Sequence, residues 1–146
     1  MINEDYVSFE TAKLLKEKGF DGSCHRYYRY DKEDIDGNGK MFMFASDLNG
    51  FCCVTNSLLN GYGDKHEETV LAPTFQMAMK WLREVHSLSV EVQFFLNEEN
   101  GTSSWNYDII DIITYCNKAK YDMCVNFKTY EQAAEAAIKY CLENLI

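Results

Sequence analysis

Apolar residues recur at the 3.6-residue period of an amphipathic helix in three segments of this chain. We expect helices over residues 9–18, 75–86 and 130–146. Ser8 precedes the first helix and Gly19 follows it, as an N-cap and a C-terminal glycine do. The side chains that these helices should bury are Phe9, Ala12, Leu14, Leu15, Ala78, Trp81, Leu82, Val85, Ala134, Ala137, Ile138, Cys141, Leu142 and Leu145.

The three helices begin with similar sequences. Thr129 precedes the third helix and Gln132 stands three residues further on, which is the spacing of a capping box. The three openings are Ser8-Phe9-Glu10-x-Ala12, Thr74-Phe75-Gln76-x-Ala78 and Thr129-Tyr130-Glu131-x-Ala133. A duplicated unit explains this likeness, and so does the common chemistry of helix starts, where a hydroxyl caps the end and Glu favours the first turn.

Between the helices the apolar period changes to two, which is typical of strands with one buried face. Residues 88–96 show this alternation most clearly, with Leu88, Val90, Val92, Phe94 and Leu96 on one side. Two groups of three strands are expected, separated by turn-like segments. The six expected strands cover residues 25–30, 41–45, 51–55, 88–96, 105–115 and 121–127.

The order of elements is therefore α-βββ-α-βββ-α, and the predicted fold class is α+β. Three helices should cover one face of a mainly antiparallel sheet. The chain has 146 residues, 47% of them hydrophobic, and a single proline. This length suits one domain with a sizeable core, and no low-complexity linker divides it. We expect one globular domain over residues 1–146.

Charge and the amino-terminal sequence limit the cellular setting. The formal net charge is −9, and the acidic residues are spread along the chain. This balance argues against nucleic acid as a partner and suits solubility or a basic partner. MINEDYVSFE lacks the features of a signal peptide, and no apolar run is long enough for a membrane span. We expect a cytoplasmic protein with no membrane association.

Cysteine usage agrees with a reducing compartment. The chain contains six cysteines but no CxxC pair. Without an export signal the thiols should stay reduced. Most of them are expected to act as small buried hydrophobic side chains.

Three stretches carry a family resemblance: YVSFETAKLLKEKGFD, LAPTFQMAMKWLREVHSLSVEV and TYEQAAEAAIKYCLENLI. They resemble a set of small uncharacterised proteins that recur in genomes and prophage-like elements of gut-dwelling Bacteroidetes. The resemblance includes all three helices and the strand after the second. It implies a cytoplasmic protein of bacterial or phage origin that is dispensable for core metabolism. It brings no catalytic or ligand-binding residue with it.

The sequence DIDGNGK, residues 34–40, has the start of a calcium-binding loop. Asp34, Asp36, Asn38 and a following glycine match the first half of an EF-hand loop. The twelfth position is Ala45, where a bidentate glutamate is required, and a strand follows instead of a helix. A hairpin turn explains the segment as well. Calcium is the only cofactor considered, through a different loop in which Asp31 or Glu33 completes the site.

Arginine and aromatic residues supply a candidate interaction surface. Arg26 and Arg29 stand among three tyrosines, an arrangement able to stack on nucleic-acid bases. Period-two geometry places the two arginines on opposite faces, and cross-strand aromatic packing accounts for the tyrosines. Trp105 begins an expected strand beside a turn, where exposed aromatics are typical of interfaces. The candidate surface comprises Arg26, Tyr28, Tyr30 and Trp105.

No recognised catalytic motif is present. The histidines are His25, His66 and His86, and the last suits the negative end of a helix. Cys24 and His25 are adjacent and should point to opposite sides of a strand. We therefore expect a small acidic, non-enzymatic module that binds an unidentified protein or itself. The alternatives are a metal- or thiol-dependent enzyme and a nucleic-acid-binding protein.

Overall fold

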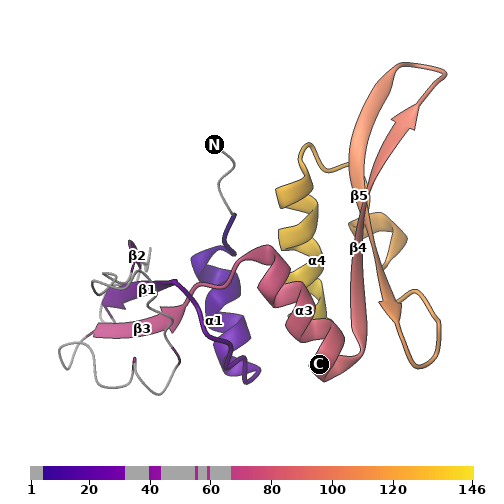
Figure 1. Ribbon diagram of the computed structural model, residues 1–146. Helices are drawn as coiled ribbons and strands as arrows, with labels where there is room; N and C mark the ends of the chain where they lie inside the picture. Colours follow the sequence, from indigo (N-terminus) through magenta and orange to yellow (C-terminus); the bar gives the residue numbers. More distant parts are fainter. Residues whose placement is uncertain (1–4, 32–39, 44–54, 56–58, 60–66) are drawn as a thin grey trace. The chain divides into compact units, whose positions relative to one another are not determined.

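This computed structural model describes residues 5–31, 40–43, 55, 59 and 67–146. Its helices and antiparallel strands form an α+β fold, as the sequence predicts. The chain divides into two compact units, Met1–Thr74 and Phe75–Ile146 (Figure 1). The single domain expected over residues 1–146 stays a prediction.

The first unit begins with helix α1, Phe9–Glu17. The Ser8 hydroxyl oxygen accepts a hydrogen bond from the Thr11 amide at 3.2 Å, so the predicted N-cap is confirmed. Gly19 has a φ of 88° directly after the helix, a conformation that glycine adopts without strain. Both ends of this helix are therefore set by the residues that the sequence indicates.

A three-stranded antiparallel sheet completes the first unit. Its strands are β1, Arg26–Asp31, β2, Lys40–Met43, and β3, Glu67–Leu71, in the order β2-β1-β3. The first two strands were predicted, whereas β3 was not. The strand expected at residues 51–55 lies outside the described residues except for Thr55, which has no strand assignment.

Backbone and side-chain hydrogen bonds connect β1 to the start of the chain. Tyr28 is buried, and its hydroxyl donates to the Val7 carbonyl at 2.7 Å. The Val7 amide in turn donates to the Pro73 carbonyl at 3.0 Å. The Phe9 ring meets Tyr28 edge-on, with centroids 5.5 Å apart. Tyr28 therefore belongs to the core of this unit.

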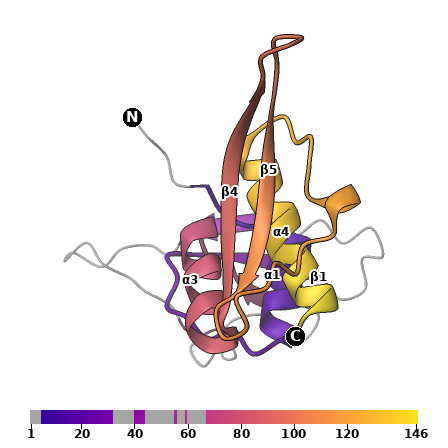
Figure 2. The ribbon, with the colours of Figure 1, turned by 90° about the vertical axis from the view of Figure 1, so that its right-hand side faces the viewer.

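The second unit consists of two helices on one face of a long hairpin. Helix α3, Phe75–His86, and helix α4, Tyr130–Asn144, lie against strands β4, Leu88–Asn97, and β5, Thr102–Asp111 (Figures 1 and 2). Alternate residues of the strands face the helices, as the period of two predicts. The fully or nearly buried side chains of this layer are Ala78, Leu82, Leu88, Val90, Tyr107, Ile109, Ala134, Ala137, Ile138, Cys141 and Leu142.

Helix α4 begins with a capping box in which the Gln132 side chain bonds the residue before the N-cap instead of the N-cap itself. The Thr129 hydroxyl oxygen accepts from the Gln132 amide at 3.2 Å. The Gln132 side-chain oxygen accepts from the amide of Lys128, one residue before the cap, also at 3.2 Å. Two amides at the helix end are thus satisfied by side chains of the same turn.

The second half differs from the sequence prediction in its last strand. Residues 121–127 were expected to form a strand but contain a 3-10 helix at Tyr121–Met123 and only an isolated bridge from Phe127 to Trp105. Asn126 has a φ of 69°, which interrupts an extended backbone. Among the described residues, the strands form a three-stranded sheet and a two-stranded sheet.

The strand predicted over residues 105–115 ends earlier, at Asp111. The Asp111 carboxylate accepts hydrogen bonds from the amides of Ile113 and Thr114, at 2.9 and 3.1 Å. These bonds lower the Asp111 pKa below its ordinary value. An Asp that bonds the backbone two residues on makes a turn, which explains the early end of the strand.

The packing of the second unit predicts unequal effects for two isoleucines. Ile109 is fully buried under the helices, whereas Ile113 is exposed in the loop after β5. Ile109→Ala should lower the free energy of unfolding by about 2–5 kcal/mol, because it leaves a cavity in the core. Ile113→Ala should change it by less than about 0.5 kcal/mol. Urea unfolding followed by circular dichroism measures both, and equal effects would contradict this packing.

Candidate interaction surface on the β4–β5 hairpin

The hairpin extends beyond the helices that cover it. Val90 lies under the helices and is only 7% exposed. Phe94 and Leu96 follow on the same face of β4, because every second residue shares a face. They are 57% and 54% exposed. The apolar face that forms a core near the helices is therefore uncovered toward the turn.

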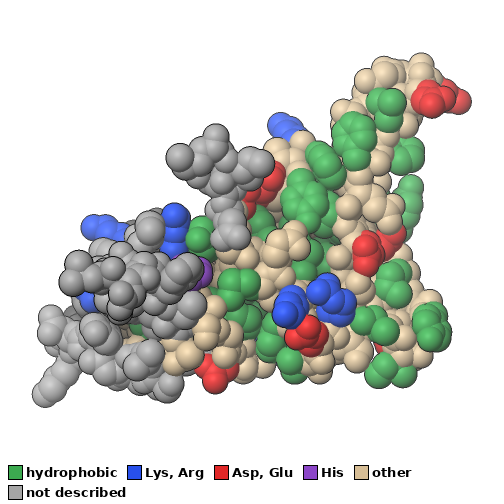
Figure 3. All heavy atoms as spheres, in the orientation of Figure 1, with side chains coloured by type: hydrophobic (Ala, Val, Ile, Leu, Met, Phe, Trp, Pro, Cys, Tyr) green, Lys and Arg blue, Asp and Glu red, His purple; other side chains and the backbone are tan. Residues whose placement is uncertain are grey.

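Aromatic rings connect this uncovered face to α4. Phe94 lies opposite Trp105 in the strand pairing, and their rings meet edge-on with centroids 5.3 Å apart. Trp105 also meets Tyr130, the first residue of α4, at 5.5 Å. Gln76 donates to the Tyr130 hydroxyl at 3.3 Å. We call Phe94, Leu96, Trp105 and Tyr130 the hairpin patch, and Figure 3 shows apolar side chains along this part of the molecule.

The strands beside the patch carry no charge. Residues 92–97 and residues 102–107 contain no acidic or basic side chain. Along the strands, the nearest charges are Glu91 and its pairing partner Asp108 on the other face of the hairpin, and Glu98 and Glu99 in the turn. At the start of α4, Lys128 and Glu131 stand close to Tyr130 in the sequence. Apolar surface without charge at its centre is the composition found in the buried middle of protein interfaces.

One edge of the hairpin is paired within the chain. The Trp105 amide donates to the Phe127 carbonyl at 2.8 Å, and the Phe127 amide donates back at 2.9 Å. The Tyr107 amide donates to the Cys124 carbonyl at 2.9 Å, and the Lys118 amide donates to the Ile109 carbonyl at 2.7 Å. Between Trp105 and Asp111, outward backbone groups of β5 thus bond to residues 116–127.

The other edge, along β4, has no such partner in the described part of the chain. Because Trp105 and Tyr107 direct their backbone groups outward, their partners Phe94 and Val92 also direct theirs away from β5. Leu96, two residues further on, does the same. Within residues 75–146 no backbone hydrogen bond from another element reaches these groups. This edge is open.

The open edge also lacks the features that usually prevent strand addition. Proteins commonly protect an edge with proline, lysine, a bulge or a short strand. β4 is ten residues long, contains neither proline nor lysine, and pairs with β5 without interruption from Leu88 to Asn97. A long regular edge beside exposed apolar side chains is suited to binding another strand.

Most other site residues suggested by the sequence do not join this surface. Asp34, Asp36 and Asn38 lie outside the described residues, as does Glu33, so the calcium loop stays a prediction. Among the residues that the structure describes, no three His, Cys, Asp or Glu side chains are grouped to hold a metal ion.

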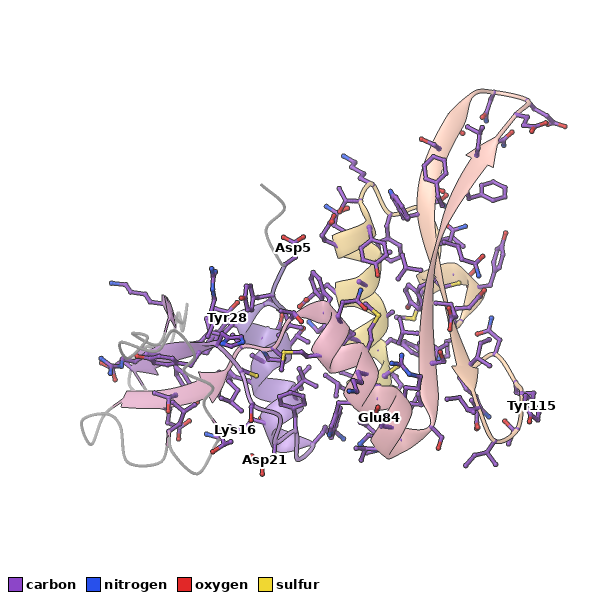
Figure 4. All side chains as sticks on the ribbon, in the orientation of Figure 1. Asp5, Lys16, Asp21, Tyr28, Glu84 and Tyr115 are labelled. Carbon is purple, nitrogen blue, oxygen red and sulfur yellow. The ribbon has the colours of Figure 1, made fainter. Side chains whose placement is uncertain are left out.

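The candidate surface on β1 is partly corrected. Tyr28 is buried rather than exposed, because its ring packs on Phe9 and its hydroxyl bonds the Val7 carbonyl (Figure 4). The Arg26 guanidinium lies over the Tyr6 ring, 4.4 Å from its centroid. Tyr30 donates to the Glu68 carboxylate; burial, then this bond, raises the Tyr30 pKa. Of the four predicted residues, only Trp105 belongs to the hairpin patch.

The sequence alone did not identify Phe94 and Leu96 as part of a candidate surface. Their alternation with polar neighbours predicted a buried face, and the sequence does not reveal how far the helices reach along it. The available signal was the absence of charge from residue 92 to residue 97.

The described cysteines do not resemble activated nucleophiles. Cys24, Cys124 and Cys141 are buried, and Cys116 is exposed. Burial raises the pKa of Cys141 to about 12 and also raises the pKa of Cys124. A reactive cysteine needs the opposite shift, toward thiolate at neutral pH. The His86 ring packs against Trp81 at the end of α3, with centroids 4.6 Å apart.

Comparison of the chain with protein-family models, with curated proteins and with solved structures gives no match. Among the described residues, no helix combines the length and apolar character needed to cross a membrane.

Thiol labelling tests the burial described above. In the folded protein at pH 8, iodoacetamide should modify Cys116 at least about tenfold faster than Cys124 or Cys141, because labelling requires exposed thiolate. Peptide mass spectrometry over a time course resolves each site. In urea the three rates should converge. Equal rates in the folded protein would show that α4 is not packed on the hairpin.

Proposed function

We propose that this chain is a small acidic, non-enzymatic interaction module that binds a protein through the hairpin patch and the open edge of β4. The observation that carries this proposal is the coincidence of exposed apolar side chains with free backbone groups on the same half of one strand. An added strand would satisfy the backbone groups and cover the side chains together.

The physical cost of leaving this surface open supports the proposal. Exposed apolar side chains gathered in one place favour association, and an unprotected strand edge favours it further. Residues 116–127 close the corresponding edge of β5, whereas no residue in the described part of the chain closes the edge of β4. A partner strand at β4 would supply backbone hydrogen bonds to this edge, as residues 116–127 do for β5.

The proposed setting is the bacterial cytoplasm, with a connection to prophage-like elements. This part rests on the resemblance of residues 6–21, 71–92 and 129–146 to the Bacteroidetes proteins described above. A metal- or thiol-dependent enzyme and a nucleic-acid-binding protein stay alternatives from the sequence, and we advance neither.

Site-specific cross-linking tests the proposal. The chain with p-benzoylphenylalanine in place of Phe95 is added to a native lysate of a gut Bacteroidetes species and irradiated. Phe95 is exposed at the open edge of β4, on the strand face opposite the hairpin patch, so a strand bound at this edge should give covalent protein adducts at this position. The adducts should disappear when Phe94→Lys is added.

The matched control places the same probe at Tyr115, which is also exposed and lies in the loop after β5 (Figure 4). This position should give few adducts. Adducts that are equally abundant at both positions, or absent at position 95, would overturn the proposed function. Mass spectrometry distinguishes an adduct with a second copy of the chain from one with another protein.

A further inference from the structure

We infer that the partner strand at the open edge is β4 of a second copy of this chain, so that two hairpins form one four-stranded antiparallel sheet. This inference rests on the proposed function and names the partner of the same surface. It follows from three properties of β4: the direction of its backbone groups, its distribution of charge and its uncovered length.

The backbone groups of β4 permit a two-fold pairing. Val92, Phe94 and Leu96 direct their amides and carbonyls outward. In an antiparallel pair centred on Phe94, Phe94 lies opposite itself and Val92 lies opposite Leu96. Every outward group in this stretch then meets an outward group of the other copy. A symmetric dimer requires a surface that is complementary to itself in this way.

The charges along β4 favour a second copy over a basic protein. In the register centred on Phe94, Glu91 faces Asn97 and Gln93 faces Phe95, so no two like charges are opposed. A basic partner strand would find no acidic side chain between residues 92 and 97. The net charge of −9 opposes association at long range only, and salt screens that repulsion.

The uncovered length of β4 matches the pairing. On the face of β4 that the helices cover, Leu88 and Val90 are buried, and the exposed residues of this face, Phe94 and Leu96, come after Val92. The register centred on Phe94 overlaps residues 91–97, the half that the helices leave open. Phe94 of each copy then lies beside Phe94 of the other, and Leu96 of each copy lies beside Val92 of the other. A two-stranded hairpin also gains stability when it joins a larger sheet.

This interface is small by comparison with permanent dimers, so we expect a reversible, concentration-dependent equilibrium. Sedimentation velocity over a range of protein concentrations, in a reducing buffer that prevents a Cys116 disulfide, measures it. The weight-average sedimentation coefficient should rise from monomer toward dimer as concentration increases. The sedimentation coefficient should rise further at high salt, because salt screens the repulsion between two acidic chains. An association driven by opposite charges would instead weaken at high salt.

Two variants test the contact itself. Phe94→Lys places two like charges opposite each other at the two-fold axis and should shift the protein to monomer. Ile113→Lys makes the same change in charge outside the edge and should leave the dimer intact. Circular dichroism and urea unfolding confirm that both variants are folded.

A backbone test separates edge pairing from side-chain contact. Leu96→Pro removes an outward amide that β5 does not use, whereas Leu96→Ala keeps this amide and removes the side chain. Leu96→Pro should raise the dimer dissociation constant about tenfold more than Leu96→Ala, because each dimer loses two hydrogen bonds. Equal effects would overturn strand pairing as the mode of association.

The remaining outcomes separate this inference from the proposed function. A protein that stays monomeric at all concentrations overturns the dimer, and so does a dimer that Phe94→Lys leaves unchanged. If the cross-linker at position 95 captures a different protein in either case, the proposed function stands without the dimer. If it captures nothing, both fail.

Discussion

The need to satisfy backbone hydrogen bonds on both edges of a two-stranded hairpin governs the second unit of this protein. β5 has its outer groups from Trp105 to Asp111 bonded by residues 116–127, although Asn126 keeps that segment from forming a regular strand. β4 has no equivalent within residues 75–146. Because unsatisfied backbone groups remain acceptable only while water reaches them, burying this edge requires a partner that supplies the missing bonds.

The apolar side chains of the hairpin are likewise covered in one part and uncovered in another. Two helices cover one half of its apolar face and leave the other half to Phe94, Leu96 and Trp105. The small residues Ala134 and Ala137 allow α4 to approach the strands closely, and Tyr130 extends its contact to Trp105. The hairpin is thus anchored firmly at one end, so that its uncovered end is held in an extended form before any partner binds. Such preorganisation lowers the entropy that binding must overcome.

The sequence predicts local structure well where several signals coincide. The residues 75–86 agree with α3 at both ends, because the apolar period, Pro73-Thr74 and the following alternation all indicate the same limits. Prediction from the sequence fails where tertiary contacts determine the local backbone structure. Residues 121–127 alternate like a strand but are shaped by Asn126 and by hydrogen bonds to β5, and β3 begins with two glutamates that a strand prediction disfavours. Trp105 was identified from its place beside a turn, whereas Phe94 and Leu96 looked like core residues until the extent of the helices was known.

Residue-resolved amide hydrogen exchange shows directly whether the edge of β4 is open in the single chain. In dilute solution the amide of Phe94, directed outward, should exchange much faster than the amide of Phe95, which pairs with β5. On concentration of the protein, Phe94 should become protected while Phe95 changes little. If the Phe94 amide is as protected as that of Phe95 at every concentration, the edge is already covered within the monomer, and the proposed function is wrong.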